Sequence, residues 1–198
     1  MLIDTYLPKY DARAFHQKRV TANPSAAFAA LRALNLEKSL IVRTLMAIRA
    51  LPSRMQAPDR VEAKPKTSRS FLDSMLQLGW VILEEAPGQE LVAGTVTQPW
   101  VATVRFRGLT PSEFVAFAEP GFTKIVWNIA ASPSNSGSII STETRVLATS
   151  PGARRRFRNY WRVVSPGVKL IRRIMLSKVR GDLRRMKKRH HASLEPNL

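Results

Sequence analysis

A glutamate and an arginine two residues apart are the side chains most suited to holding a polar group. Glu143 and Arg145 lie in residues 138–149, a run rich in β-branched residues that predicts a strand. Side chains two apart on a strand project from the same face. If that face borders an apolar cavity, the pair could orient the polar head of a ligand. The alternative is a structural ion pair with a neighbouring strand or the last helix, which the sequence favours without excluding the ligand role.

Tryptophan side chains are the other candidates for a binding site. The chain contains Trp80, Trp100, Trp127 and Trp161. Large aromatic rings both fill cores and line apolar pockets, so their spacing does not separate the two roles. We expect core packing for each ring taken singly and a cavity contact for at least one. Trp127 and Trp161 are the best placed, because they fall in a predicted central strand and in the predicted last helix.

The sequence gives little support for catalysis or metal binding. There are no cysteines, which removes thiolate nucleophiles and Cys-ligated metals, and there are only 3 histidines. No serine nucleophile elbow, HExxH or phosphate-cradling glycine motif accompanies His16, so we favour a solvent-facing strand position for it. His190 and His191 follow a basic run and lack further ligands. We therefore predict no catalytic residue, no metal site and no cofactor.

Positive charge is concentrated in the last quarter of the chain. The 198 residues include 32 Lys and Arg against 14 Asp and Glu, a net charge of +18, and residues 151–198 hold 15 and 2 of these, a net +13. Such a field attracts polyanions at long range. We favour a solvated helix face for residues 153–180, and from residue 181 onward membrane contact, nucleic-acid contact and simple solubility stay open. The candidate basic surface comprises Arg154, Arg155, Arg158, Arg184, Arg185, Lys187, Lys188 and Arg189.

The first half of the chain predicts one strand followed by helices. Residues 13–22 read as the strand, and Asn23 with Pro24 suits a helix start that leads into an Ala-rich run to Leu34. A second helix is predicted over 36–51, where apolar residues recur at helical spacing. A proline-containing connector follows over 52–67, and a short helix over 68–78.

The middle of the chain predicts two hairpins separated by a short helix. Residues 80–85 and 90–97 flank the turn signal Pro87-Gly88, and residues 123–131 and 138–149 flank a polar turn at 133–137. Between the hairpins, Thr110, Pro111 and Glu113 have the spacing of a capping box at the start of a helix. Strands joined by short turns pair antiparallel.

A long helix is predicted over 152–190. Its apolar stripe comprises Phe157, Trp161, Val164, Val168, Ile171, Met175, Val179 and Met186. Because proline removes a backbone donor and clashes with the preceding turn, Pro166-Gly167 predicts a kink or a break that gives one short and one long helix. The fold class is therefore α+β, with a long C-terminal helix covering one face of an antiparallel sheet and short helices after the first strand.

Residues 1–186 are expected to form a single domain, since a chain of this length can bury about 70% of its unfolded surface. Residues 187–198 are expected to be a flexible basic tail. No segment predicts a membrane span or a secretory signal, so the expected location is the cytoplasm, with peripheral membrane contact left open.

Several stretches resemble a known superfamily. They are Ser141-Thr142-Glu143-Thr144-Arg145-Val146, residues 153–161, Pro166-Gly167, Phe114 with Phe117, Glu119-Pro120-Gly121 and Arg49-Ala50-Leu51-Pro52. Together they resemble bacterial members of the START/Bet v 1-like (SRPBCC, polyketide cyclase-like) helix-grip superfamily. The resemblance implies a sheet curved around the long helix and an apolar cavity between them, which in relatives holds lipids, hormones or aromatic polyketides. The basic tail after Met186 departs from the family pattern.

The resulting hypothesis is binding or carriage of a small hydrophobic ligand, lipid or polyketide-like, in that cavity. An alternative is a cyclase or aromatase-type enzyme that uses Glu143 or His16 for proton transfer. A further alternative is a binder of anionic membrane, or less favourably nucleic acid, through the basic C-terminal segment. The predicted cavity residues are Trp80, Trp127, Glu143, Arg145, Trp161, Val164 and Val168. The sequence specifies neither the ligand nor the oligomeric state.

Overall fold

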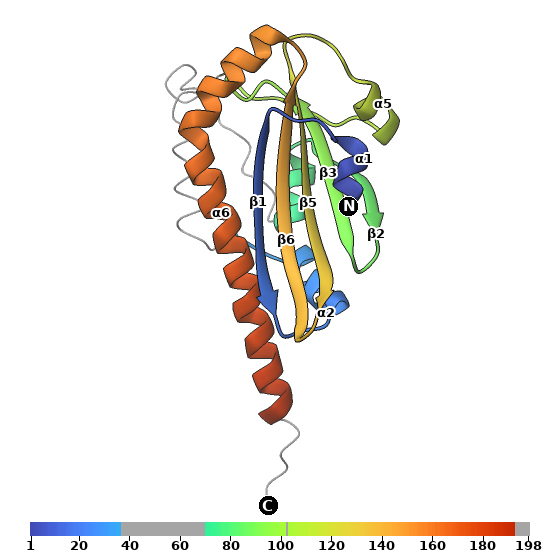
Figure 1. Cartoon of the computed structure of the whole chain (residues 1–198), viewed down its shortest axis with the longest axis vertical. Coiled ribbons are helices and arrows are strands. Elements are labelled where there is room, and N and C mark those ends of the chain that lie inside the picture. The colour runs from blue at the N-terminus through green and yellow to red at the C-terminus, as the bar shows by residue number, and fades with distance from the viewer. Residues whose placement is uncertain (37–69, 102, 193–198) are drawn as a thin grey trace, which may run out of the picture.

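The computed structural model describes residues 1–36, 70–101 and 103–192 (Figure 1). The helix predicted over 36–51 and the connector predicted over 52–67 lie outside the described residues, except for Leu36. The helices are α1 (Leu2–Tyr6), α2 (Pro24–Arg32), α4 (Phe71–Gln77), α5 (Pro111–Ala116) and α6 (Pro151–Ala192). The strands are β1 (Ala12–Val20), β2 (Val81–Ala86), β3 (Glu90–Thr97), β4 (Phe106–Arg107), β5 (Thr123–Ser134) and β6 (Gly137–Ala148).

All strands join one antiparallel sheet in the order β1-β6-β5-β3-β2, with β4 paired to β3. The β5–β6 hairpin is the longest pair, and its tight turn ends at Gly137. Gly137 has φ +134, and a Cβ there would lie 2.3 Å from the carbonyl oxygen of Val20. A side chain at this turn would therefore collide with the end of β1.

The short helices begin where their capping residues predict. The side chain of Asn23 accepts a hydrogen bond from the backbone N–H of Ala26 at 2.8 Å, and Pro24 opens α2. Thr110 and Glu113 form the predicted capping box at the start of α5. Each cap satisfies backbone donors that the helix itself leaves free.

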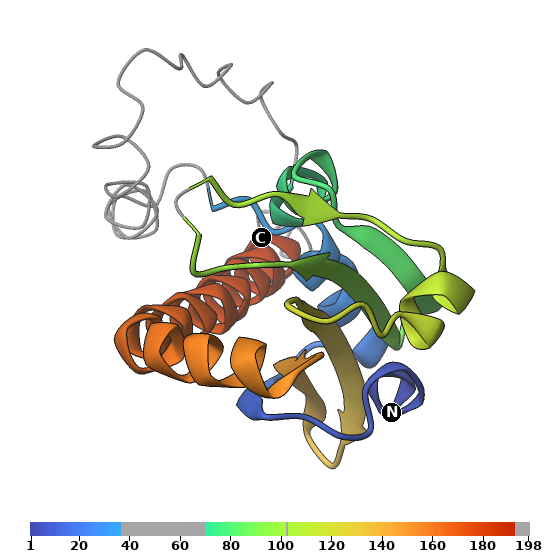
Figure 2. The ribbon, with the colours of Figure 1, turned by 90° about the horizontal axis from the view of Figure 1, so that it is seen from above.

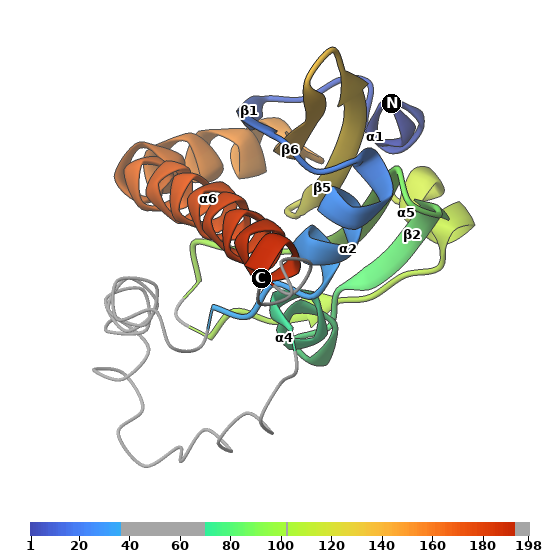
Figure 3. The same ribbon diagram turned by 90° about the horizontal axis from the view of Figure 1, so that it is seen from below.

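Helices cover both faces of the sheet. Figure 3 shows α2 and α6 on one side and α1 on the other. On the α6 side, alternate residues of the central strands, such as Leu91, Trp127 and Ile140, belong to one apolar cluster. Their neighbours Val92 and Val126 pack with Ile3 of α1 in a second cluster on the opposite side. Both faces of the sheet are thus buried, and each packs against a different apolar cluster.

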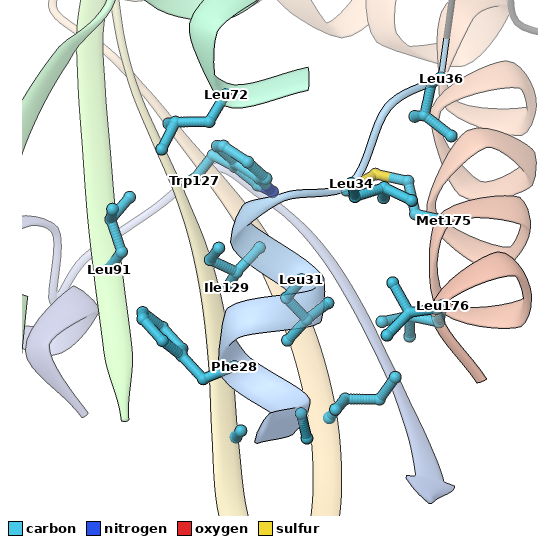
Figure 4. Packing of buried hydrophobic residues seen from close by; sticks show 14 of the residues in the cluster. Phe28, Leu31, Leu34, Leu36, Leu72, Leu91, Trp127, Ile129, Met175 and Leu176 are labelled. Atoms are coloured by element: carbon cyan, nitrogen blue, oxygen red, sulfur yellow. The ribbon is translucent and has the colours of Figure 1, made fainter. Parts of the chain in front are cut away.

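Half of the α6 side is tightly filled. Phe28 and Leu31 of α2 pack toward Ile129 of β5, and Met175 and Leu176 of α6 close the layer (Figure 4). Every one of these side chains is at most 4% exposed. This packing fixes the C-terminal half of α6 against the sheet and leaves its N-terminal half to enclose a different region.

The sequence predicted a kink or a break at Pro166, and because α6 is continuous from Pro151 to Ala192 the break into two helices is wrong. The axis does change direction, because the first turns run across the end of the sheet before the helix descends along β1 (Figures 1 and 2). Loss of one backbone hydrogen bond at Pro166 bends a helix without ending it when the turns on both sides are anchored. Buried Phe157 and Met175 supply those anchors.

The predicted α+β class, with an antiparallel sheet and a long C-terminal helix in a helix-grip arrangement, is confirmed. Both hairpins and the helices at residues 24 and 71 are present as expected. The sequence did not predict α1 or the short edge strand β4. Helix α6 extends two residues beyond the predicted end at residue 190 and so includes residues 187–192 of the segment expected to be a tail.

Candidate ligand cavity

A cavity of about 330 Å³ lies between the sheet and the N-terminal half of α6. Its described walls come from α4, the start of β2, the centre of the sheet and four turns of α6. The lining residues are Leu36, Phe71, Ser74, Met75, Leu78, Trp80, Pro99, Phe106, Ile125, Thr144, Val146, Phe157, Tyr160, Trp161, Val164, Val168, Ile171 and Arg172. The volume falls within the range of about 300–1,000 Å³ that is typical of small-molecule sites.

Two sequence periodicities bring these walls together. On α6, Phe157, Trp161, Val164 and Val168 recur every three or four residues and therefore share one face of the helix. On β6, Thr144 and Val146 are two apart and face the same side of the sheet. The cavity lies between these two apolar surfaces, next to the part of the sheet that α2 and the C-terminal half of α6 cover tightly.

Two pairs of aromatic rings line the cavity. Trp80 and Phe106 lie with ring centroids 6.3 Å apart, and Phe157 and Trp161 lie 5.6 Å apart. Such pairs hold each ring in a defined orientation and present flat apolar surfaces. The walls are therefore shaped to contact planar or extended hydrophobic groups.

Arg172 is the one charged residue among the described residues that line the cavity. Its Nη2 donates a hydrogen bond to Oγ1 of Thr144 at 3.1 Å, and its Nη1 lies 3.3 Å from the sulfur of Met175. The guanidinium lies over the rings of Trp127 at 5.0 Å and Phe71 at 6.0 Å. Within the described part of the chain it has no carboxylate partner, and its Nε donates to no acceptor.

Burial is the dominant influence on this guanidinium. Arg172 is 7% exposed. Removal from water lowers the pKa of Arg172 to about 9, since the charged form loses hydration. The group therefore remains cationic at neutral pH. The cavity thus combines apolar walls with a single buried positive charge.

Of the predicted cavity residues, Trp80, Trp161, Val164 and Val168 line the cavity. Trp127 does not. It lies on the correct face of β5 but is enclosed behind Phe71 and Arg172, and its Nε1 donates to Oγ1 of Thr142 at 2.7 Å. Trp127 is therefore a core residue that supports the guanidinium from behind.

The prediction that Glu143 and Arg145 face the cavity is wrong. Because β6 alternates, the cavity takes Thr144 and Val146, and Glu143 and Arg145 project to the opposite face beneath α1. There, Nε of Arg145 donates to Glu143 at 2.6 Å, and Nη2 lies 2.8 Å from Asp4. The alternative structural reading, an ion pair with neighbouring elements, matches this arrangement.

Further hydrogen bonds complete the Glu143 cluster. Arg13 of β1 donates to both carboxylate oxygens of Glu143 at 2.7 and 3.1 Å, and Asn128 accepts from the Glu143 backbone N–H at 2.7 Å. Burial alone would raise the pKa of Glu143. The hydrogen bonds from Arg13 and Arg145 outweigh burial and hold the pKa of Glu143 below its ordinary value. The carboxylate therefore stays ionised, and its oxygens are held in ion pairs with Arg13 and Arg145.

The favoured solvent-facing position of His16 is wrong, because His16 is half-buried on the α6 face of β1, although it does not line the cavity. Burial, together with the charges of Arg173, Arg172 and Lys169, lowers the pKa of His16, and its Nδ1 has no hydrogen-bond partner among the described groups. Across residues 1–36, 70–101 and 103–192, no three His, Asp or Glu side chains gather where they could hold a metal ion.

The predicted basic residues lie along the outer side of α6. Arg154, Arg155 and Arg158 are exposed near its start, and Arg154 pairs with Asp11 at 2.7 Å. Arg184, Arg185, Lys187 and Arg189 are exposed near its end, which extends past the sheet in Figure 1. The Lys188 side chain lies outside the described part of the chain. None of the described helices combines the length and apolar content needed to cross a membrane.

Comparison with solved structures finds likeness at very low sequence identity. Protein MLL2253 from Mesorhizobium loti shares 13% identity, with 88% of this chain and 98% of that chain covered and a TM-score of 0.37. KanY shares 14% identity over 87% and 97%, with a TM-score of 0.37. Ara h 8.0201 shares 10% identity over 87% and 97%, with a TM-score of 0.30. No family model and no curated protein matches the sequence.

Arg172 is the charged cavity residue that the sequence analysis does not identify, and apolar lining residues such as Phe71 and Phe106 are likewise absent from the predicted set. The sequence analysis favours a solvated helix face for residues 153–180, which include Arg172. The signal was nevertheless present, since Arg172 follows Val168 by four residues and precedes Met175 by three, which places it on the apolar stripe. An arginine in register with apolar residues differs from its neighbour Arg173, which is exposed.

Proposed function

We propose that the protein binds and carries a small hydrophobic ligand in the cavity between the sheet and α6. The observation that supports this is the cavity itself, which has about 330 Å³ of space bounded by aromatic and aliphatic side chains. Protein interiors are otherwise packed with few voids larger than a water molecule. The same function follows from the resemblance to the START/Bet v 1-like superfamily.

Affinity in such a site comes mainly from moving apolar ligand surface out of water, at about 25 cal/mol per Å². The elements that form both walls are held in place by the rest of the fold. The sheet side, with Ile125 and Val146, belongs to the central strands, and the α6 side is anchored on both sides of Pro166. A largely preformed site of this kind loses little affinity to ordering the protein.

Two neighbouring valines of α6 provide a direct test. Val164 lines the cavity, and Val163 is 80% exposed on the other side of the helix. Val164→Trp should fill the cavity, and Val163→Trp should leave it unchanged while adding the same side chain to the same turn. The measurement is isothermal titration calorimetry, which the added tryptophans do not disturb, checked by native mass spectrometry, with a panel of fatty alcohols, fatty acids and planar polyketides.

The expected result is saturable 1:1 binding of at least one compound by the wild type and by Val163→Trp, and a loss of at least about tenfold in affinity for Val164→Trp. Absence of saturable binding to the whole panel would overturn the proposal. Equal affinity of the two tryptophan variants would place the binding elsewhere and would also overturn it.

A further inference from the structure

Arg172 is built into the cavity with its charge uncompensated. A guanidinium carries five N–H donors, of which the described neighbours take one through the Thr144 hydroxyl and one through the Met175 thioether, a weak acceptor. The faces of Trp127 and Phe71 stabilise the cation but carry no opposing charge. Buried charges in proteins are ordinarily paired, because desolvation of a lone ion is costly.

The rest of the molecule shows what a fully partnered buried arginine looks like. Arg145 is 5% exposed, close to the 7% of Arg172, and contacts the carboxylates of Glu143 and Asp4 and the carbonyl of Leu7. The chain therefore supplies acidic partners to one buried arginine and, within its described residues, none to the other. The difference is that Arg172 borders a cavity.

We infer that Arg172 is the anchor for an anionic ligand, namely an amphiphile with one acid group on an apolar body. This inference rests on the proposed function and specifies its ligand class. The acid group forms the ion pair that the described chain does not provide, and its oxygens accept from the N–H donors left over by Thr144 and Met175. The body of the ligand then lies against Trp80, Trp161 and the aliphatic walls.

The charge count limits the acid to a single negative charge. Arg172 is the one cation among the described lining residues, so a second negative charge on the ligand would itself be buried without a partner. A planar carboxylate matches the guanidinium fork in a bidentate manner, and a sulfate monoester offers the same charge with different geometry. Carboxylic acids are therefore expected to bind best, and neutral analogues of equal length to bind more weakly.

The test compares decanoic acid, decyl sulfate and decanol on four proteins by isothermal titration calorimetry at pH 7.5. The proteins are the wild type, Arg172→Met, Arg172→Lys and Arg173→Met. Arg173 follows Arg172 on the same helix but is exposed, so Arg173→Met is a control that removes the same charge outside the cavity. The readout is the ratio of acid affinity to alcohol affinity within each protein, which cancels differences in ligand hydrophobicity between variants.

The acid-to-alcohol ratio should fall about 10- to 100-fold in Arg172→Met, in line with loss of a charge-assisted hydrogen bond, and should stay within about twofold of wild type in Arg173→Met. Arg172→Lys should retain part of the preference, because it keeps the charge and loses the fork. Equal ratios in wild type and Arg172→Met would overturn the inference while leaving hydrophobic binding intact. Failure of all three compounds to bind the wild type in the cavity would instead count against the proposed function.

A second measurement covers the case in which Arg172→Met does not fold. The ¹⁵Nε–¹Hε signal of Arg172 in the wild type, identified by its absence in Arg172→Lys, should shift on titration with decanoate and stay in place with decanol. A signal that responds equally to both compounds would overturn the inference, because the acid group would then make no contact of its own with the guanidinium.

Discussion

The two faces of the sheet each bury an arginine from the C-terminal part of the chain, and they treat it in opposite ways. Beneath α1, Arg145 is held by carboxylates 2.6 and 2.8 Å away and by the carbonyl of Leu7 at 3.0 Å. Beneath α6, Arg172 has only a hydroxyl, a thioether and aromatic rings among its described neighbours. The first environment uses the charge to join α1 to β6, and the second leaves the charge available at the wall of a cavity.

This difference distinguishes the structural charge of Arg145 from the ligand-binding charge proposed for Arg172 without reference to sequence motifs. A charge that holds a fold together is surrounded by groups of opposite charge from the chain. A charge that binds a ligand has hydrogen-bond donors that stay without acceptors until the ligand is bound. The rest of the fold must then offset the free energy of burying that unpaired charge. Stability and binding measurements should therefore respond differently at the two arginines.

The largest expected effect comes from replacing Arg145 by methionine, with the same replacement at Arg172 as the comparison. Arg145→Met leaves Glu143 with one fewer cation and Asp4 with the N-terminal ammonium of Met1 as its remaining described partner, and should lower the free energy of unfolding by about 3–5 kcal/mol. Arg172→Met removes a buried charge together with its ring contacts, and these opposing changes should leave stability within about 1 kcal/mol of wild type. Urea denaturation followed by circular dichroism measures both. Equal losses would erase the contrast between the two faces.

Glu143→Gln tests the same cluster from its acidic side. It should cost about 3 kcal/mol at pH 7, because Arg13 and Arg145 lose the charge that they share. The pKa of Glu143 is lower in the folded protein than the ordinary glutamate value of about 4.5, so the unfolded chain takes up a proton first as the pH falls. The contribution of the carboxylate is therefore complete above about pH 4.5 and disappears as the pH falls through the lower folded pKa.

The measurement is the difference in unfolding free energy between wild type and Glu143→Gln at pH 7, 5, 4 and 3. The difference should shrink as the pH falls below 4.5. A difference that stays constant to pH 3 would show that the glutamate acts through its shape and packing, with no role for its charge.

Element-level structure was largely predictable from the sequence because its causes are local. Asn23 with Pro24 and Thr110 with Glu113 mark helix starts through hydrogen bonds to residues three positions away. Which side of the sheet a given strand face turns to, in contrast, is determined by elements far away in the sequence. Spacing placed Glu143 and Arg145 together on one face correctly, yet the face that received the cavity depended on where α6 docks after residue 151.

Arg172 shows the same limit from the other direction. Its register on the apolar stripe was visible, but its lack of a described acidic partner is a property of packed neighbours from β6 and α4. The helix break at Pro166 was overpredicted for a related reason. Local chemistry weakens the helix at that point, and buried contacts of Phe157 and Met175 on either side keep it continuous.

Thr144→Val should produce an intermediate effect. The substitution keeps the side-chain shape and removes the hydroxyl that accepts from Nη2 of Arg172 at 3.1 Å. Leaving this buried donor without an acceptor should cost about 1–2 kcal/mol of stability. Thermal and urea unfolding check this value. In Arg172→Met the same threonine change should cost distinctly less, and an equal cost in both backgrounds would mean that Thr144 contributes through other contacts.

The smallest expected effect concerns His16, which lies on the cation-rich side of the sheet. Arg173, Arg172 and Lys169 of α6 add to burial in lowering the pKa of His16 below 6.5, so the folded protein resists a proton that the unfolded chain accepts. The stability associated with neutral His16 is thus present above about pH 6.5 and falls as the pH drops below it.

His16→Gln should flatten the decline in unfolding free energy between pH 7.5 and 5.5, by less than about 1 kcal/mol in total. The effect of His16→Gln on this pH dependence should be smaller in the Arg172→Met background than in the wild type, because one of the charges that oppose protonation of His16 is gone. An equal effect in both backgrounds would mean that the charge of Arg172 is already neutralised near His16, which would weaken the contrast between the two faces.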